Sequence, residues 1–372
     1  MLVKNTLASL CLFCLVLCTM LSISINKSWA LEKENHEGLH LDLSTKLKAY
    51  CEKLDTSFKK YRWGKSECES FSWYHIRDSV LGDPLTWTIF GEVGADHDKD
   101  GLAKKDVTMV MCGVHGDEIT PIKFCFDLMY YLRDSLQDPE FKKSFENKVV
   151  LIAPLVNPDS YFKRRPTRTN ARGVDVNRNF PTEDWYKDAQ KMWISKYRKD
   201  KRRNPGKIPA SEPELVFQMN LIKRYNPDKI ISVHSPLSIL DYDGPSLATG
   251  ISPADNVDPN KAQELLIQMS KDASDYRIEN YPFFPGSLGN WAGQERSIPT
   301  YTLELPTSNP AKSKDYWALF KASMHKAVFH DIRTLVDGHT TQNQKKEGEP
   351  LKKLESYAPV NLPANEPIGQ MP

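Results

Sequence analysis

The apolar run over residues 107–111 stops at two glycines, and this break decides which architecture the chain can adopt. A short apolar run of this kind predicts a buried strand, and Gly113 and Gly116 let the backbone turn into a helix predicted over residues 119–136. Open α/β sheets hold their functional residues at such strand-to-helix junctions. His115 and Glu118 lie in this junction three positions apart, so both can reach one metal ion, and their donor atoms suit zinc.

Strands and helices alternate along the rest of the chain. Apolar runs predict strands over residues 86–90, 149–156, 229–233 and 300–305, and we expect strands 86–90 and 107–111 to be neighbours. Helical periodicity predicts helices over residues 213–225, 265–276 and 317–336, with Ser211 as a candidate N-cap of the first. This alternation predicts an α/β fold: a mixed, mainly parallel twisted sheet with helices on both faces.

The two ends of the chain differ from its middle. An apolar run over residues 7–25 follows Lys4, and Ser28 and Ala30 supply a cleavage pattern, which predicts a secretory signal peptide over residues 1–30. The alternative is an uncleaved membrane anchor, because the run approaches the length of a spanning helix. We predict a helical extension over residues 31–73, a main domain over 74–338 and a disordered polar tail over 339–372. An exported, periplasmic or extracellular protein is expected.

Charge and cysteine content narrow the class of partner. The formal net charge is +2, with 50 basic and 48 acidic residues, which gives no reason to expect nucleic-acid binding. Outside the predicted signal, Cys51 and Cys68 are candidates for a disulfide in an oxidising compartment. Cys112 and Cys125 sit in apolar runs, and we expect buried thiols there.

Two polar segments each admit two interpretations. Residues 96–101 match the first half of a calcium-binding loop, but Val107 occupies the position of the bidentate Glu, so a solvated acidic hairpin loop is expected. The basic run over residues 196–203, with Trp193 nearby, could contact an anionic wall polymer or a membrane. Single-sign runs are more often solvated insertion loops, and that is the expectation here.

A third metal-ligand candidate follows downstream. His234 lies at the end of the predicted strand 229–233 and completes a His/Glu/His set with His115 and Glu118. Three protein ligands leave a fourth position for water, which distinguishes a catalytic zinc from a structural one.

The segment between these ligands carries a family signature. Asp175-Val176-Asn177-Arg178-Asn179-Phe180 follows the His-x-x-Glu pair, and in this order the motifs resemble the zinc metallocarboxypeptidases. The resemblance covers about residues 74–336. It includes Asn157-Pro158-Asp159, Ser211-Glu212-Pro213-Glu214 and the predicted strand that contains Glu304.

The resemblance implies a role for each matched residue. Arg178 and Asn177 would hold the free carboxylate of the substrate, since a guanidinium fork and an amide suit that group. Glu304 would be the general base that activates the hydrolytic water. Arg168 would stabilise the oxyanion, although Arg164, Arg165 and Arg172 compete for that role. Tyr281 would be the mobile tyrosine that closes over bound substrate, with a structural aromatic as the alternative.

Substrate preference is a weaker inference from the same resemblance. The motifs look closest to bacterial members that act on cell-wall peptides, cutting between γ-D-glutamate and diaminopimelate or removing a terminal residue from murein stem peptides. Leu288 matches the position that sets side-chain preference in digestive relatives. Asp241, Asp243 and Ser287 are candidates for contacting the amine of diaminopimelate. The alternatives are a general carboxypeptidase, an amidohydrolase of the aspartoacylase type, and an inactive protein that binds wall peptides.

Overall fold

The structure, a computed structural model, describes residues 44–93, 105–245 and 257–334. The chain divides into two compact units, residues 1–50 and 51–372, and the helix over residues 44–60 includes the boundary between them. The predicted signal peptide, the acidic loop at 96–101 and the predicted tail lie outside the described residues. The predicted domain boundaries stay predictions.

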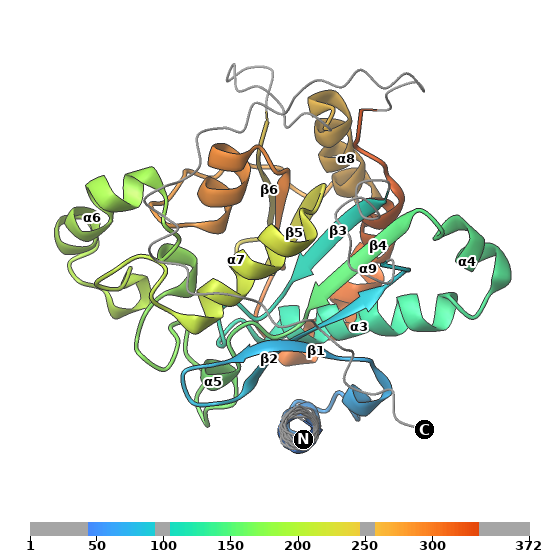
Figure 1. Cartoon of the computed structure of the whole chain (residues 1–372), viewed down its shortest axis with the longest axis horizontal. Coiled ribbons are helices and arrows are strands. Elements are labelled where there is room, and N and C mark those ends of the chain that lie inside the picture. Colours follow the sequence, from blue (N-terminus) through green and yellow to red (C-terminus); the bar gives the residue numbers. More distant parts are fainter. Residues whose placement is uncertain (1–43, 94–104, 246–256, 335–372) are drawn as a thin grey trace, which may run out of the picture. The chain divides into compact units, whose positions relative to one another are not determined.

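A seven-stranded mixed sheet forms the centre of the second unit (Figure 1). Its order is β1-β2-β4-β3-β5-β7-β6, and the four inner strands β4, β3, β5 and β7 run parallel. The strands on either side, β2 and β6, pair antiparallel with this group, and β1 pairs antiparallel with β2. The strands are β1 Tyr74–Asp78, β2 Pro84–Phe90, β3 Asp106–Met111, β4 Lys148–Ala153, β5 Lys229–His234, β6 Ile239–Asp243 and β7 Thr300–Glu304.

This topology confirms the predicted fold class and corrects one pairing. Strands β2 and β3 are not neighbours, because β4 lies between them and pairs with both. The chain makes a helical crossover after β3 and returns as β4, so β3 gains parallel partners on both sides. Sequence patterns do not encode which strand fills the position between two others.

Helices cover both faces of the sheet (Figure 1). The apolar side chains of α7 pack with those of β2, β3 and β4 on one face, and α3 and α9 contact β4 and each other on the opposite face, where α8 packs on α9. The α-helices are residues 44–60, α3 Ile119–Ser135, α4 Pro139–Ser144, α5 Pro158–Tyr161, α6 Gln190–Ser195, α7 Pro213–Tyr225, α8 Pro259–Asp272 and α9 Ser313–Phe329. Short 3-10 or π segments are η1 Cys68–Ser70, η2 Val176–Arg178, η3 Trp185–Ala189, η4 Lys201–Arg203, η5 Gly289–Gln294 and η6 Pro310–Lys312.

Helix ends follow local capping chemistry. The bounds of α7 agree with the prediction, but Glu212 and not Ser211 occupies its N-cap position. Helix α8 begins earlier than predicted because Asp258 accepts a hydrogen bond from Asn260 N and Pro259 occupies the first turn. Helix α9 is shorter at its C-terminal end than predicted and stops at Phe329.

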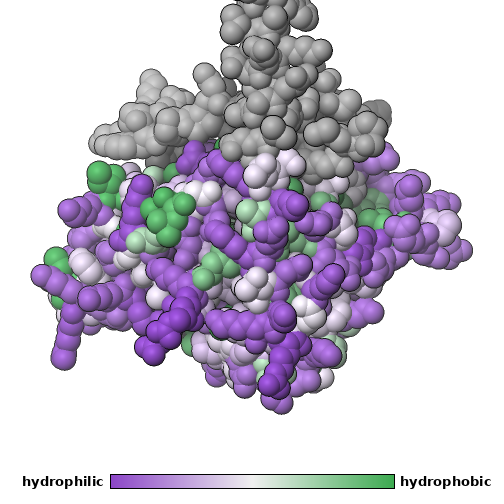
Figure 2. Space-filling model, turned by 90° about the horizontal axis from the view of Figure 1, so that it is seen from below, coloured by the Kyte–Doolittle hydropathy of each residue, from purple (hydrophilic) through white to green (hydrophobic). Residues whose placement is uncertain are grey.

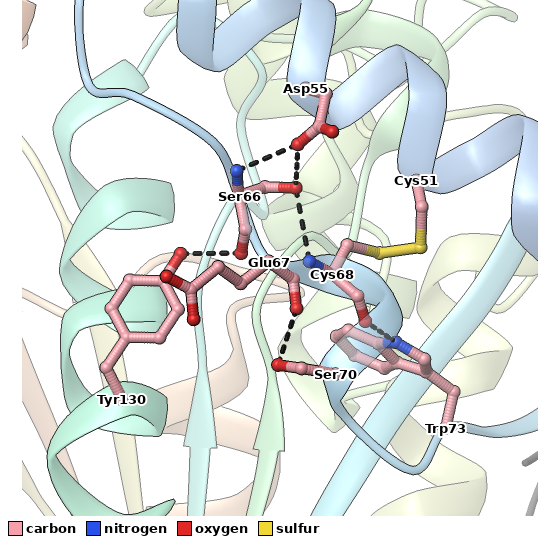
Figure 3. The surroundings of a disulfide bond; sticks show 8 residues. All are labelled: Cys51, Asp55, Ser66, Glu67, Cys68, Ser70, Trp73 and Tyr130. Atoms are coloured by element: carbon pink, nitrogen blue, oxygen red, sulfur yellow. Dashed lines mark hydrogen bonds between the residues drawn. A yellow bond between two sulfur atoms is a disulfide. The ribbon is translucent and has the colours of Figure 1, made fainter. Parts of the chain in front are cut away.

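Two disulfides tie segments of the second unit together. Cys51 is joined to Cys68, the pair that the sequence offered as disulfide candidates. Figure 3 shows the surrounding contacts: Ser66 donates to Asp55 and Trp73 donates to the Cys68 carbonyl. The expectation of free thiols at Cys112 and Cys125 is wrong. These residues form a second disulfide because the end of β3 and helix α3 bring their Cα atoms to 6.3 Å, within the reach of such a bond.

On the face shown in Figure 2, hydrophobic side chains occur in small separate groups among hydrophilic ones. Across the described residues, no helix combines the length and the apolar character that crossing a bilayer requires.

Candidate metal centre and substrate cleft

His115, Glu118 and His234 converge at the carboxyl edge of the parallel strands. His115 and Glu118 lie on the turn between β3 and α3, and His234 is the last residue of β5. Each offers a ligand atom within 4.8 Å of the others, and all three side chains are buried. His115 Nδ1 lies 2.8 Å and His234 Nδ1 lies 2.9 Å from the two oxygens of the Glu118 carboxylate. Two imidazole nitrogens and a carboxylate are a donor set that fits zinc.

The other ring nitrogen of each histidine also has a partner. His115 Nε2 lies 3.1 Å from Asp175 Oδ1, and His234 Nε2 lies 2.9 Å from Ser232 Oγ. Such outer contacts fix the ring orientation and the tautomer of a metal-binding histidine. The sequence analysis singled out neither residue, although Asp175 opens the Asp-x-Asn-Arg signature and was the available signal.

Glu304 is placed beside this centre by strand pairing. It is the last residue of β7, and its Cα is the register partner of His234 on β5. Its Oε2 accepts a hydrogen bond from Leu237 N at 3.3 Å. Burial raises the pKa of the Glu304 carboxyl, and the nearby imidazole of His234 opposes that rise. A carboxylate held at the rim of a metal site is in the position that a general base requires.

Arg168 contacts the metal centre directly. Its Nε donates to Asp175 Oδ2 at 2.8 Å and its Nη1 donates to Glu118 Oε1 at 3.1 Å. Burial depresses the pKa of Arg168, but the carboxylates of Asp175 and Glu118 outweigh it and raise the pKa above its usual value. Arg168 lines the cleft and the competing arginines do not: Arg164, Arg165 and Arg172 are exposed. The geometry therefore favours Arg168 for the oxyanion role.

Arg178 and Asn177 form one wall of the same cleft, whose volume is about 370 Å³. The Arg178 guanidinium stacks over the Phe284 ring at 4.2 Å, and burial lowers its pKa to about 10. Asn177 Oδ1 accepts a hydrogen bond from Leu288 N at 2.8 Å, so its amide nitrogen is the group available to a carboxylate. Gly286 has φ +75°, and a Cβ there would lie 2.4 Å from Arg178 O.

Residues 281–288 complete the cleft opposite the strands. Tyr281, Ser287 and Leu288 all line it, and Tyr281 N donates to Asp241 Oδ1 at 3.0 Å. Leu288 is buried and supplies an apolar contact surface. The structure thus gathers every sequence-predicted site residue into one cleft: His115, Glu118, Arg168, Asn177, Arg178, His234, Asp241, Asp243, Tyr281, Ser287, Leu288 and Glu304.

Two carboxylates at the cleft floor lack a cationic partner. Asp241 and Asp243 lie two positions apart on β6, so both side chains point to one face of the sheet, and they are 6% and 7% exposed. In the described part of the chain, neither forms an ion pair with a lysine or arginine. Burial, and then the charge of Asp241, raise the pKa of Asp243 to about 8.

Glycines make room for Asp243. A Cβ added at Gly289 would lie 1.7 Å from Asp243 Oδ2, and one added at Gly293 would lie 2.6 Å from the Asp243 backbone. The π-helical segment η5 therefore packs closely against Asp243. Neither glycine has a side chain that could donate a hydrogen bond to the carboxylate. A desolvated acid of this kind takes up a proton in the absence of a cation, and a cationic ligand would favour its charged form.

Several of the recognised motifs lie outside the cleft and hold its loops. Asp159 accepts hydrogen bonds from Ser79 Oγ at 2.6 Å and Leu81 N at 2.9 Å. Asn170 Nδ2 donates to both Glu212 and Glu214, at 2.7 and 2.9 Å, which connects the arginine-rich loop to the start of α7. These contacts hold the loops around the cleft in place.

Part of the basic run, which the sequence analysis did not assign to the site, also lines the cleft. Asp200, Arg202 and Arg203, from the basic run, line its mouth. Arg202 forms an ion pair with Asp117, which lies between the metal-ligand candidates His115 and Glu118. No local pattern predicts that contact, because the two segments are 85 positions apart.

Comparisons with known proteins agree with this geometry. A family profile described as zinc carboxypeptidase matches residues 64–317. Murein peptide amidase A from Escherichia coli (strain K12) is 31% identical over 252 residues, which are 66% of this chain and 86% of that protein. Bovine thrombin-activatable fibrinolysis inhibitor has a similar fold, with a TM-score of 0.53 at 18% identity over 78% of this chain and 96% of that one. Carboxypeptidase A from Helicoverpa armigera gives 0.51 at 18% identity, covering 76% and 72%.

Proposed function

Because this chain belongs to the zinc carboxypeptidase family and is therefore a zinc-dependent hydrolase of peptide bonds, we propose that its substrates are peptidoglycan stem peptides. The scissile bond is the amide next to a residue with a free carboxylate, either between γ-D-glutamate and diaminopimelate or before a terminal residue. The similarity to murein peptide amidase A, most of whose length this chain covers, supports this substrate class.

The observation that carries the proposal is the pairing of opposite charges in one cleft. Arg178 on one wall suits a substrate carboxylate, and the unpaired Asp241 and Asp243 would accept a substrate cation, whose charge would lower the raised pKa of Asp243. Diaminopimelate carries both groups: a carboxylate beside the scissile amide and an ammonium at the far end of its side chain. We assign the ammonium to Asp243 and the hydroxyl of Ser287, which both line the cleft.

The residues around the cleft then divide the chemistry among themselves. Zinc, when bound by His115, Glu118 and His234, polarises the scissile carbonyl and lowers the pKa of a water molecule. Glu304 takes the proton of the attacking water and passes it to the leaving amine. Arg168 stabilises the negative charge that develops on the carbonyl oxygen. Tyr281 closes over the substrate from the opposite side.

Export of the protein is part of the proposal. Stem peptides occur outside the cytoplasmic membrane, and the predicted signal at residues 1–30 would direct the chain there. The disulfides Cys51–Cys68 and Cys112–Cys125 are typical of proteins that fold in an oxidising compartment. We propose a periplasmic or extracellular location, with cleavage after Ala30.

A second candidate function is a carboxypeptidase for ordinary peptides that end in lysine or arginine. The same acid pair favours it, because a basic side chain would also satisfy Asp241 and Asp243. The two candidates differ in what precedes the scissile bond: a γ-linked D-glutamate in one case and an α-linked residue in the other.

Mass-spectrometric digestion tests both candidates. Zinc-loaded protein is incubated with a murein tripeptide, a murein tetrapeptide and a panel of ordinary peptides with lysine, arginine or apolar C-termini. We expect release of diaminopimelate or of a terminal residue from the murein peptides, reduced about 10³-fold in Glu304→Gln. Cleavage confined to ordinary peptides would establish the second candidate. No cleavage of any peptide by the zinc-loaded protein would favour an inactive wall-peptide binder.

A further inference from the structure

The segment over residues 187–207 concentrates positive charge at the mouth of the cleft. It contains nine lysine and arginine residues and two aspartates, a net charge of +7. Since the whole chain carries +2, the other residues together carry −5. We name residues 187–207 the basic insertion. It contains α6 and η4, and Figure 1 shows α6 on the opposite side of the view from α4.

Most cations of the basic insertion have no acidic partner. Three are paired: Lys187 with Glu183, Arg202 with Asp117 and Arg203 with Asp200. The other six form no ion pair with a described residue, and all six are exposed: Lys191, Lys196, Arg198, Lys199, Lys201 and Lys207. In a solvated loop of mixed charge, we would expect acidic residues to lie among the lysines and arginines and to pair with them. The field of the basic insertion is therefore available to a ligand.

The turn that presents these cations is fixed by hydrogen bonds. Arg198 and Lys199 have φ +50° and +57°, so two successive residues adopt the left-handed conformation. Trp193 holds this turn, because its carbonyl accepts from Lys199 N at 2.8 Å and its Nε1 donates to Asp200 O at 2.8 Å. Fixed charges lose less conformational entropy when a ligand binds than charges on a loose loop do.

We propose that the basic insertion is a docking surface for a polyanionic chain, one that carries phosphate or carboxylate groups along its length. A single exposed cation holds an anion weakly in water, so a small anion would not be retained. A polymer engages several cations at once, and its binding energies accumulate along the chain. The net negative charge of the other residues favours binding of such a polymer at the basic insertion.

The basic insertion lies next to the cleft, which suggests how polymer binding would serve hydrolysis. Its positive charge continues through Arg202 and Arg203 to the lining of the cleft. A polymer held on Arg198, Lys199 and Lys201 would therefore lie beside the cleft mouth and raise the local concentration of any substrate peptide attached to it. This inference does not depend on which peptide bond the cleft hydrolyses.

Matched triple variants test the proposal. The first is Arg198→Gln with Lys199→Gln and Lys201→Gln, none of which lines the cleft. The control is Lys142→Gln, Lys143→Gln and Lys314→Gln, exposed residues on α4 and α9. Both variants lower the net charge equally. Binding of labelled long-chain polyphosphate and of polygalacturonate to the zinc-loaded protein is measured over a series of salt concentrations, with neutral dextran as a blank.

We expect the first triple to bind either polyanion about tenfold more weakly at low salt and the salt dependence to flatten by about two to three counterions. The control triple should bind like the parent protein. Hydrolysis of a free peptide should be the same in all three proteins. Binding to polyphosphate alone would identify phosphate as the ligand group, and binding to both polymers would identify charge density; either result supports the proposal.

Three results would overturn it. The parent protein could show no salt-sensitive binding, or the two triples could lose affinity equally, in which case only net charge matters. The third is tighter binding to vesicles of phosphatidylglycerol than to either polymer. Ile194 in the basic insertion and Ile208, the residue that follows it, are 52% and 54% exposed, so that result would identify a membrane surface instead.

Discussion

The two ends of the central strands both bury charged groups, but they treat them differently. At the amino end, Asp106 accepts hydrogen bonds from Lys148 Nζ and Lys229 Nζ, both at 2.7 Å. The two lysines also donate to the carbonyls of Phe329 and His330, so the cluster is closed within the chain. At the carboxyl end, the His/Glu/His set is left for a metal to complete. The acids of β6 lie further along the sheet, where Asp241 and Asp243 pair with Thr302 and Thr300 of β7, and they are left for a ligand.

The presence or absence of a partner within the chain distinguishes buried charges that stabilise the fold from buried charges that serve a reaction. A buried charge that is paired and hydrogen-bonded within the chain stabilises one packing arrangement, here the attachment of the segment after α9 to the sheet. A buried charge without such a partner lowers stability and persists where a ligand completes it. The same sheet therefore carries a stabilising ion-pair cluster at one end and a candidate reaction site at the other.

Removing zinc should have the largest effect, and only at the carboxyl end. We expect chelation with 1,10-phenanthroline to lower peptide hydrolysis by about 10⁴-fold or more, because the carbonyl and the water lose their activation together. Activity should return when zinc is added. Far-UV circular dichroism is the control for folding. Full activity in protein whose metal content has been shown to be nil would contradict the assignment.

Breaking the cluster of Asp106, Lys148 and Lys229 at the amino end should lower stability and leave the activity of the folded protein unchanged. Lys229→Met leaves Asp106 with one cation and the His330 carbonyl without a donor, and we expect the free energy of unfolding to fall by about 3 kcal/mol. Urea denaturation measures this loss, with the exposed Lys314→Met as the matched control. Zinc content and kcat at low temperature should be unchanged. A kcat that falls in proportion to stability would remove the distinction between the two ends.

The role of Arg178 in binding the substrate carboxylate can be tested by changing the shape of its side chain at constant charge. Arg178→Lys keeps the positive charge but loses the planar fork, and we expect kcat/KM to fall about 10²-fold on peptides with a free carboxylate. The same peptide with an amidated terminus is the control, because it offers Arg178 nothing to bind. An equal loss on both substrates would mean that Arg178 acts on folding and not on the carboxylate.

The smallest effect is expected at Asp243, and it depends on pH. The pKa of this carboxyl is raised to about 8, so between about pH 4 and pH 8 the folded chain keeps a proton that the unfolded chain has released. Stability of the parent protein should therefore fall as pH rises through this window. Asp243→Asn should remove that decline and be more stable by on the order of 2 kcal/mol at pH 8.

Two measurements sharpen that test. Thermal unfolding at pH 4 and pH 8 gives the stability difference, with Glu140→Gln on α4 as an exposed control for the loss of one acid. Hydrolysis of peptides with a cationic side chain next to the scissile bond should weaken in Asp243→Asn, while peptides with an apolar one should not. A parallel loss on both substrate types would place Asp243 outside substrate recognition.

Local patterns predicted most of the elements and the metal-ligand candidates. Strand period and helix caps act over a few residues, so the strand ends that carry His234 and Glu304 could be identified directly. The partner of Cys112, the position of β4 between β2 and β3, and the contact of Asp175 with His115 could not. Each depends on segments that become neighbours only when the whole sheet is assembled.

The residues between Tyr281 and Leu288 are fastened at both ends. Tyr281 N is held by Asp241, Phe180 N donates to Gly286 O, and Leu288 N is held by Asn177. The exposed positions between these anchors, Pro282 and Phe283, can therefore be exchanged without moving Arg178 or the strands. This makes the loop a natural site for randomised libraries: a new side-chain preference could be selected there while the hydrolytic machinery stays fixed, provided that Gly286 is left in place.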